Sequence, residues 1–202
     1  MMEVSATLVR ELRDKTGAGV MDCKKALAEA EGDLDKAVVW LREKGIAAAA
    51  KRAGRVASEG AIGSYIHAGG KLGVLIELNC ETDFVAKTAE FQTLVRELAM
   101  QVAAANPRCI QREELPAEVI QQEREIYASQ SADKPAAVVG KIVEGKLEKF
   151  YREVCLMEQA WVRDPNRTIK DLLGEHAGKL GEKIELRRFV RFQLGEQLDG
   201  KV

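Results

Sequence analysis

Two acidic side chains near the middle of the sequence are spaced so that they could take part in chemistry. Glu81 and Asp83 are two residues apart, and in an extended chain both would point to the same side. Such a pair could act in acid–base catalysis or bind a metal ion. No histidine or third acidic residue is adjacent to the pair. We therefore predict neither a catalytic nor a metal-binding role for these carboxylates.

The thiols and imidazoles do not form a recognisable reactive site either. Four cysteines are widely spread along the chain, without the C-x-x-C spacing of redox or zinc motifs: Cys23, Cys80, Cys109 and Cys155. His67 and His176 do not lie at a zinc-site spacing from a cysteine or from each other. Because a nucleophilic cysteine needs a nearby base, we predict buried, inert thiols at Cys23, Cys80 and Cys155, and no metal.

The segment from Thr16 to Asp22 (TGAGVMD) is the nearest match to a phosphate-binding loop. It lacks a third glycine, follows a predicted helix instead of a strand, and has no G-K-[ST] ending. We predict a tight turn between two helices, in which glycine supplies a positive φ. The chain is therefore not expected to bind a nucleotide or any other cofactor directly.

The elements that would position these residues begin with three short helices. Apolar side chains recur at amphipathic spacing in residues 1–45, and each break between the helical patterns carries a glycine. The breaks lie at residues 17–19, at Gly32 and at Gly45. We predict a three-helix docking domain at residues 1–45, because so small a bundle is marginally stable alone. Small residues and cations then predict a partly helical linker at residues 46–59.

Residues 60–202 are predicted to form an α+β core. From Ala61 to Cys80 the side chains alternate with a period of two around a Gly-Gly break, which predicts a β-hairpin. A third strand is predicted near residues 184–194, in a small antiparallel sheet with one face covered. Helices are predicted between and before these strands: Glu90–Ala105, Ala117–Ser131, Ala136–Met157 and, after a turn at Asp164–Asn166, Ile169–Leu180. This order is typical of an α+β fold rather than of alternating βαβ units.

The charge balance argues against a protein that mainly binds nucleic acid. Lys plus Arg total 31 against 32 for Asp plus Glu, the formal charge is −1, and only 5% of residues are aromatic. An RNA-binding protein is the alternative, and it would use the basic linker and an Arg-rich C-terminal strand: Lys51, Arg52, Arg55, Arg187, Arg188 and Arg191. An enzyme that uses the central carboxylates and the thiols is a weaker alternative. The start of the chain has no basic segment followed by an apolar run, so we expect a cytoplasmic protein.

The most informative segment is residues 79–87 (NCETDFVAK). Phe84 follows Asp83 where the predicted strand ends and before a helix begins, a place where side chains can project from a rigid scaffold. From its residue type alone, Phe84 could equally be a core residue, because phenylalanine is usually buried. The residues themselves leave both alternatives open.

Three segments of the sequence closely resemble one protein family. They are Thr16–Leu27 (TGAGVMDCKKAL), Glu77–Ala86 (ELNCETDFVA) and Arg187–Gly195 (RRFVRFQLG). In their residues and in their order along the chain, they are similar to the signatures of elongation factor Ts, the guanine-nucleotide exchange factor for elongation factor Tu. The resemblance implies a ubiquitin-associated-like N-terminal domain that docks on the nucleotide-binding domain of elongation factor Tu, with contacts from Val20 and Met21.

The resemblance also implies a mechanism. Thr82, Asp83, Phe84 and Val85 match the motif that reaches toward the magnesium side of the partner's nucleotide pocket. Contact there would promote GDP release and allow GTP to bind again, with no covalent chemistry, by coupling two binding equilibria. Longer family members carry a second copy of the core unit and a coiled-coil insertion, so this chain resembles a short form. Because an exposed edge strand favours association, we also expect a homodimer.

Overall fold

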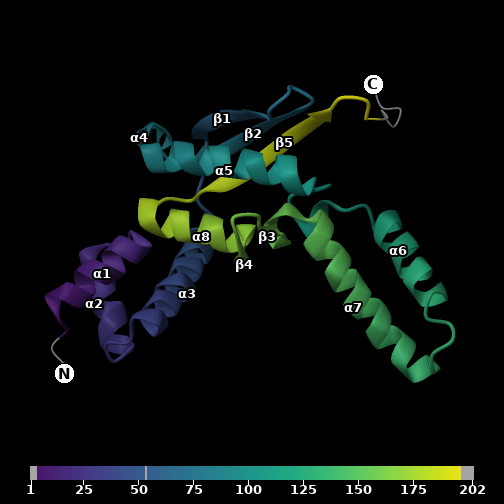
Figure 1. The fold of residues 1–202 in the computed structure, drawn as a ribbon, viewed down its shortest axis with the longest axis horizontal. Helices are drawn as coiled ribbons and strands as arrows, with labels where there is room; N and C mark the ends of the chain where they lie inside the picture. Colours follow the sequence, from purple (N-terminus) through teal and green to yellow (C-terminus); the bar gives the residue numbers. More distant parts are fainter. Residues whose placement is uncertain (1–3, 53, 197–202) are drawn as a thin grey trace. The chain divides into compact units, whose positions relative to one another are not determined.

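The computed structural model describes residues 4–52 and 54–196 (Figure 1). The elements in chain order are α1 (Ala6–Thr16), α2 (Val20–Glu29), α3 (Leu34–Arg52), β1 (Glu59–Ile66), β2 (Leu72–Cys80), α4 (Asp83–Ala86), α5 (Ala89–Ala105), η1 (Arg112–Glu114), α6 (Ala117–Ser129), α7 (Ala136–Val154), η2 (Leu156–Glu158), β3 (Ala160–Trp161), β4 (Asp164–Thr168), α8 (Ile169–Leu180) and β5 (Glu185–Gln193). This order confirms the predicted α+β class.

The chain forms two compact units, and each is assembled from segments that are separate in sequence. The first contains residues up to 62, residues 77–95 and residues 171–187. The second contains residues 63–76, residues 96–170 and the residues from 188 onward. The domain borders predicted at residues 45 and 59 stay a prediction.

The first three helices pack around a small apolar core, as predicted. The Ser5 side chain caps α1 by accepting a hydrogen bond from the backbone N–H of Thr7, and Gly17 ends the helix in the left-handed conformation with φ 65°. The buried side chains of this core come from all three helices: Leu12, Cys23, Ala26, Leu27, Ala30 and Ala37. The interhelical turn predicted at Thr16–Asp22 is therefore confirmed.

Helix α3 is longer than the sequence pattern predicts. The expected break at Gly45 is wrong, because the helix continues to Arg52. Alanine has the highest helix propensity of any residue type. The run of alanines that follows Ile46 therefore outweighs the cost of one glycine in the helix. A Cβ added at Gly45 would lie 3.5 Å from the carbonyl oxygen of Gly174 in α8, which is an ordinary contact distance.

The three-stranded sheet has the order β1-β2-β5 and is antiparallel, which confirms the predicted hairpin and third strand. Alternate residues of β2 point to the buried face, including Val74, Ile76 and Leu78. Gly60 in β1 has φ 145°, and a Cβ added there would lie only 2.2 Å from the Leu78 carbonyl oxygen. Only glycine therefore fits at this position, where the backbones of β1 and β2 approach each other closely.

Helices α6 and α7 form a helical hairpin in the second unit (Figure 1). Its base is held by backbone hydrogen bonds between the segments around Cys109 and Cys155, whose sulfur atoms lie 3.5 Å apart. Arg112 adds ion pairs to Glu148 in α7 and to Glu158 in η2. The last predicted turn of α7 is replaced by η2, so the helix ends three residues earlier than expected.

A small second sheet, formed by β3 and β4, was not predicted from the sequence. Ala160 pairs with Thr168 and Trp161 with Asp164, where the sequence indicated only a turn. The fully buried Gln101 of α5 supports this hairpin by donating to the Ala160 carbonyl and accepting from the Val162 N–H. The predicted helix Ile169–Leu180 follows directly and is confirmed as α8.

Within residues 4–52 and 54–196, the structure contains no helix that is both long enough and apolar enough to cross a membrane.

Candidate protein-binding site

The motif Thr82–Val85 forms the start of a one-turn helix directly after β2. Thr82 caps α4, because its Oγ1 accepts a hydrogen bond from the Val85 N–H at 3.4 Å. Phe84 is 80% exposed, so the alternative that it is a core residue is wrong. Exposing a large apolar side chain forgoes about 1.5–3 kcal/mol of burial free energy. A ring in this position is typical of a contact residue for another protein.

The carboxylates of Glu81 and Asp83 do not act as a pair. Their predicted alignment rested on an extended chain, but the chain turns into α4 at Asp83, and each carboxylate has its own cationic partner. Asp83 accepts a hydrogen bond from Lys87 Nζ at 2.6 Å, which lowers the pKa of Asp83. The pKa of Glu81 is lowered by the backbone N–H of Lys183, at 2.6 Å, and by Arg55. Both groups are therefore ionised near neutral pH, where neither can donate a proton.

Glu182, a third acidic residue, holds the motif Thr82–Val85 in place. Glu182 Oε2 accepts hydrogen bonds from the backbone N–H groups of Glu81 and Thr82 at 3.0 and 3.1 Å. Glu182 Oε1 accepts a third bond from Thr82 Oγ1 at 2.6 Å. In return, Glu81 accepts the bond from the Lys183 N–H. We call this set of four residues, Glu81, Thr82, Glu182 and Lys183, the carboxylate clamp.

Sequence reasoning missed Glu182. The residue lies 100 positions from Thr82, in a loop after α8 with no periodic pattern of its own. Its role depends on tertiary contact between two loops, which local composition does not reveal. The only sequence signal is an acidic side chain directly after Gly181, and a single exposed-type residue of this kind does not indicate a partner.

Val20 and Met21 form a separate exposed patch at the start of α2. They are 49% and 76% exposed, and they follow Gly19, which occupies the N-cap of the helix without a side-chain hydrogen bond. The structure thus places the six predicted contact residues in two groups, one on α2 and one on α4. Both groups belong to the first compact unit.

The thiols and histidines do not form a reactive centre among the described residues. All four cysteines are free and buried, and burial raises the pKa of each thiol, that of Cys155 to about 12. No group of three or more His, Cys, Asp or Glu side chains in residues 4–52 and 54–196 is placed to hold a metal ion. His67 contacts the Tyr65 hydroxyl at 2.9 Å, and His176 faces Glu90 at 3.3 Å.

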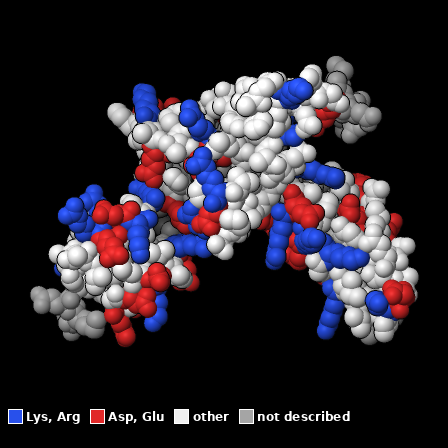
Figure 2. All heavy atoms as spheres, viewed as in Figure 1, with Lys and Arg blue, Asp and Glu red and all other residues white. Residues whose placement is uncertain are grey.

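Several cations of the alternative RNA-binding surface are engaged in contacts within the protein. Arg55 pairs with Glu81 in the carboxylate clamp at 3.2 Å. In β5, Arg191 pairs with Glu196 at 3.5 Å, and Arg187 lies 3.8 Å from Glu77. Basic and acidic side chains are interspersed on the visible surface (Figure 2). The intramolecular ion pairs leave these cations less available to a phosphate backbone.

Comparison with known proteins identifies the family. The family model described as "Elongation factor TS" matches residues 28–196. A curated relative from Thermoanaerobacter sp. (strain X514), named elongation factor Ts, is 60% identical over 198 residues, which make up 97% of this chain and 97% of the relative. The chain belongs to the elongation factor Ts family. The elongation factor Ts of Anaeromyxobacter dehalogenans (strain 2CP-1 / ATCC BAA-258) is 61% identical over an alignment of 203 positions, which covers 100% of this chain and 93% of the relative.

Membership of the elongation factor Ts family places the chain in translation elongation. The family model begins after the TGAGVMDCKKAL segment, whereas the curated relatives match nearly the whole chain. The elongation factor Ts of Carboxydothermus hydrogenoformans (strain ATCC BAA-161 / DSM 6008 / Z-2901) is also similar, at 58% identity over 200 residues, or 98% of this chain and 92% of the relative. The sequence resemblance first seen in three segments therefore extends over nearly the whole chain.

Proposed function

We propose that this chain promotes the release of GDP from elongation factor Tu in the cytoplasm, and so allows GTP to bind. The observation that carries the proposal is the exposed Phe84 ring on a turn held by the carboxylate clamp. Thr82, Asp83 and Val85 flank the ring on α4. The ring would insert between side chains of the partner near the magnesium ion that screens the GDP phosphates. Displacing the groups that hold the ion weakens the hold on GDP.

No covalent step is needed for this activity, because the two binding equilibria are coupled. A factor that prefers nucleotide-free elongation factor Tu weakens GDP binding by the same free energy by which GDP weakens the factor's own binding. Incoming GTP displaces the factor by the same linkage. The chain is therefore regenerated in each cycle and acts as an exchange factor rather than as an enzyme of covalent chemistry.

A second contact is proposed at the N-terminal helices. Val20 and Met21 expose apolar surface at the start of α2, and we propose that this patch docks on the nucleotide-binding domain of elongation factor Tu. In this arrangement residues 1–45 serve as the docking domain, 46–59 as the linker and 60–202 as the core. Two contacts on one partner raise the overall affinity through effective concentration.

The test is a GDP-release assay. Elongation factor Tu loaded with fluorescent GDP is mixed in a stopped-flow instrument with excess unlabelled GDP, with and without the purified chain. We expect the release rate to rise with the concentration of the chain, and we expect added GDP to dissociate a preformed complex of the two proteins. A release rate that does not respond to the chain would refute the proposed function.

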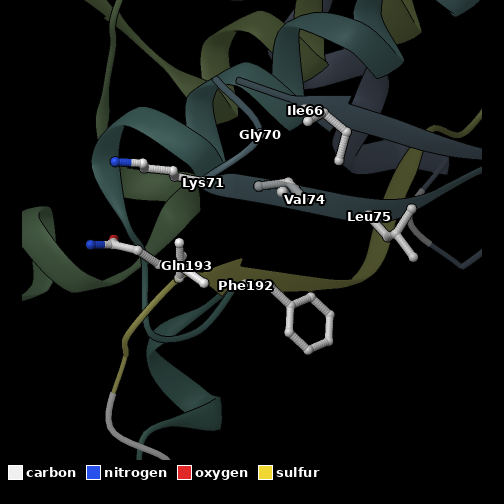
Figure 3. A pocket seen from close by; sticks show the side chains of 9 residues that line it. Ile66, Gly70, Lys71, Val74, Leu75, Phe192 and Gln193 are labelled. Carbon is white, nitrogen blue, oxygen red and sulfur yellow. The ribbon is translucent and has the colours of Figure 1, made fainter. Parts of the chain in front are cut away.

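We further propose that one face of the sheet pairs with a second copy of this chain. Apolar side chains from three strands lie exposed around a shallow hollow in the second unit: Ile66, Leu75, Phe192 and Leu194 (Figure 3). Strands β1 and β5 are the edges of the sheet. An isologous two-fold contact would cover the same patch on both copies.

Light scattering tests the homodimer. We expect twice the chain mass at high micromolar concentration, and the monomer mass for Phe192→Glu, because a charge would be buried without a partner in the interface. Parent protein that stays monomeric at this concentration contradicts the homodimer but leaves the exchange activity open to its own assay.

A further inference from the structure

The carboxylate clamp joins the turn that carries Phe84 to a loop far away in the sequence. Residues 81–82 give two backbone N–H groups and one hydroxyl to Glu182, and the Lys183 N–H bonds back to the Glu81 side chain. Each loop thus supplies one carboxylate and donates backbone N–H groups to the carboxylate of the other loop. All four residues belong to the first compact unit.

We propose that Glu182 is a positioning residue for nucleotide exchange, and that the carboxylate clamp holds the Asp83–Phe84 turn in its binding conformation before the partner arrives. This inference rests on the proposed exchange function. Glu182 acts through the turn and is not assigned a contact with the partner.

The need for such an anchor follows from the length of α4. This helix has four residues, and one helical turn is unstable in isolation because nucleation fixes several dihedral angles for one hydrogen bond. The Thr82 cap contributes one weak bond of 3.4 Å to the Val85 N–H. The Phe84 ring adds little packing to the protein itself, since it is 80% exposed. Gln92 Nε2 and Thr88 Oγ1 hold the end of the turn through the carbonyls of Ala86 and Val85, at 2.8 Å each. The direction in which the chain enters the turn depends on contacts made just before it.

The chemistry of the clamp suits this role. Hydrogen bonds that an ionised carboxylate accepts are stronger than bonds between neutral groups. The three bonds to Glu182 fix the backbone at residues 81 and 82 and the rotamer of the capping Thr82 hydroxyl. Arg55 pairs with Glu81 at 3.2 Å and orients the second carboxylate of the clamp. Together these contacts set the direction in which the chain enters α4.

The clamp would affect binding through the fraction of molecules in which the turn has the binding conformation. If only a fraction of molecules holds the turn correctly, the apparent affinity for the partner falls by that fraction. Loss of Glu182 should therefore weaken exchange by lowering the population of binding-competent turns, while the contact residues stay in place. A tenth of the molecules in the competent conformation corresponds to an apparent affinity about tenfold weaker.

The experiment compares three single variants in the GDP-release assay. Glu182→Ala removes all three bonds, and we expect kcat/KM for GDP release to fall about tenfold. Glu182→Gln keeps an acceptor oxygen for the backbone N–H groups, and we expect it to restore most of this loss. Glu185→Ala is the matched control, because Glu185 pairs with the side-chain Nζ of Lys183, whereas the clamp uses only the backbone N–H of Lys183. We expect no change for this control.

A double-mutant cycle with Phe84→Ala separates positioning from general destabilisation. If Glu182 acts through the turn, Glu182→Ala causes a clearly smaller loss in the Phe84→Ala background than in the parent, where both Asp83 and Phe84 depend on the turn. An equal loss in both backgrounds would overturn the inference, because it would show an effect that does not pass through Phe84.

Amide hydrogen exchange on the unbound protein gives a readout that does not depend on the partner. We expect the Glu81 and Thr82 amides to exchange faster in Glu182→Ala and to keep the parent rate in Glu185→Ala. Unchanged rates at both amides in Glu182→Ala would overturn the clamp. If the amides respond while Phe84→Ala leaves GDP release unchanged, the proposed function fails and the clamp stands as a structural device.

Discussion

The Phe84→Ala variant tests the proposed contact most directly. Removing the ring should leave the folded chain nearly unaffected, because Phe84 is 80% exposed and lies outside the core. Surface substitutions of this kind change the free energy of unfolding by about 0.5 kcal/mol or less. Thermal and denaturant unfolding should therefore give the parent values.

The exposed area of Phe84 also gives the expected loss of binding free energy in the complex with elongation factor Tu. Aromatic side chains bury about 150–250 Å² when they are fully covered. Because 80% of the residue is still in solvent, roughly 120 Å² or more remains to be buried by a partner. At about 25 cal/mol per Å², this area is worth about 3 kcal/mol, and contact residues of this kind typically cost about 2 kcal/mol or more on truncation.

These figures predict a loss of roughly 30- to 150-fold in the affinity for nucleotide-free elongation factor Tu, and a similar loss in kcat/KM for GDP release. The assay is stopped-flow release of fluorescent GDP over a range of factor concentrations. The matched control is Val162→Ala, which truncates an exposed apolar side chain between β3 and β4. Parent-like exchange by Phe84→Ala, with unfolding also unchanged, would refute the reasoning.

Three further predictions concern the fold around the site. Gly60→Ala should lower the free energy of unfolding by about 2–4 kcal/mol in a urea titration, because the new Cβ would meet the Leu78 carbonyl at φ 145°; a parent-like midpoint would contradict the close approach. Gln101→Leu should cost about 1–3 kcal/mol by the same measurement, since it removes the bonds that the fully buried Gln101 makes to the Ala160 carbonyl and the Val162 N–H, and an unchanged stability would show that water replaces the side chain. Glu81→Gln should be less stable than the parent near neutral pH, with a difference in melting temperature that shrinks as the pH falls through the acidic range, because the Lys183 N–H and Arg55 hold the folded-state pKa of Glu81 below the ordinary value of a glutamate. A difference that grows on acidification would show that the sign is wrong.

Much of the fold could be predicted because its signals are local. The period-two alternation from Ala61 to Cys80 gave the hairpin β1–β2, and the apolar spacing in residues 169–180 gave α8. Other elements gave no such signal. Strand β3 has two residues, too few to show a period, and the Asp-Pro-Asn sequence that begins β4 is typical of a turn. The break predicted at Gly45 failed because the helix propensity of the alanines that follow outweighs the cost of one glycine.

The candidate site was predictable only in part, for a physical reason. The motif and its position at a strand end are visible in the sequence, but phenylalanine alone does not indicate whether it is buried. The exposure of Phe84 is a tertiary property, set by the turn at Thr82 and by the absence of a cover over α4 among the described residues. Glu182 was invisible for the same reason, since it becomes part of the site only through contacts between distant loops.

The distance in sequence between the turn and its anchor has a consequence for biosynthesis. Ribosomes make the chain from the N-terminus, so that Phe84 leaves the ribosome before Glu182, which follows Thr82 by 100 positions, has been added. A nascent or truncated chain that stops at residue 170 carries the whole TDFV sequence but lacks the loop that holds it and the strand β5 that completes the sheet. The carboxylate clamp is therefore assembled only near the end of synthesis, and an incomplete chain would carry Phe84 on a turn without its anchor.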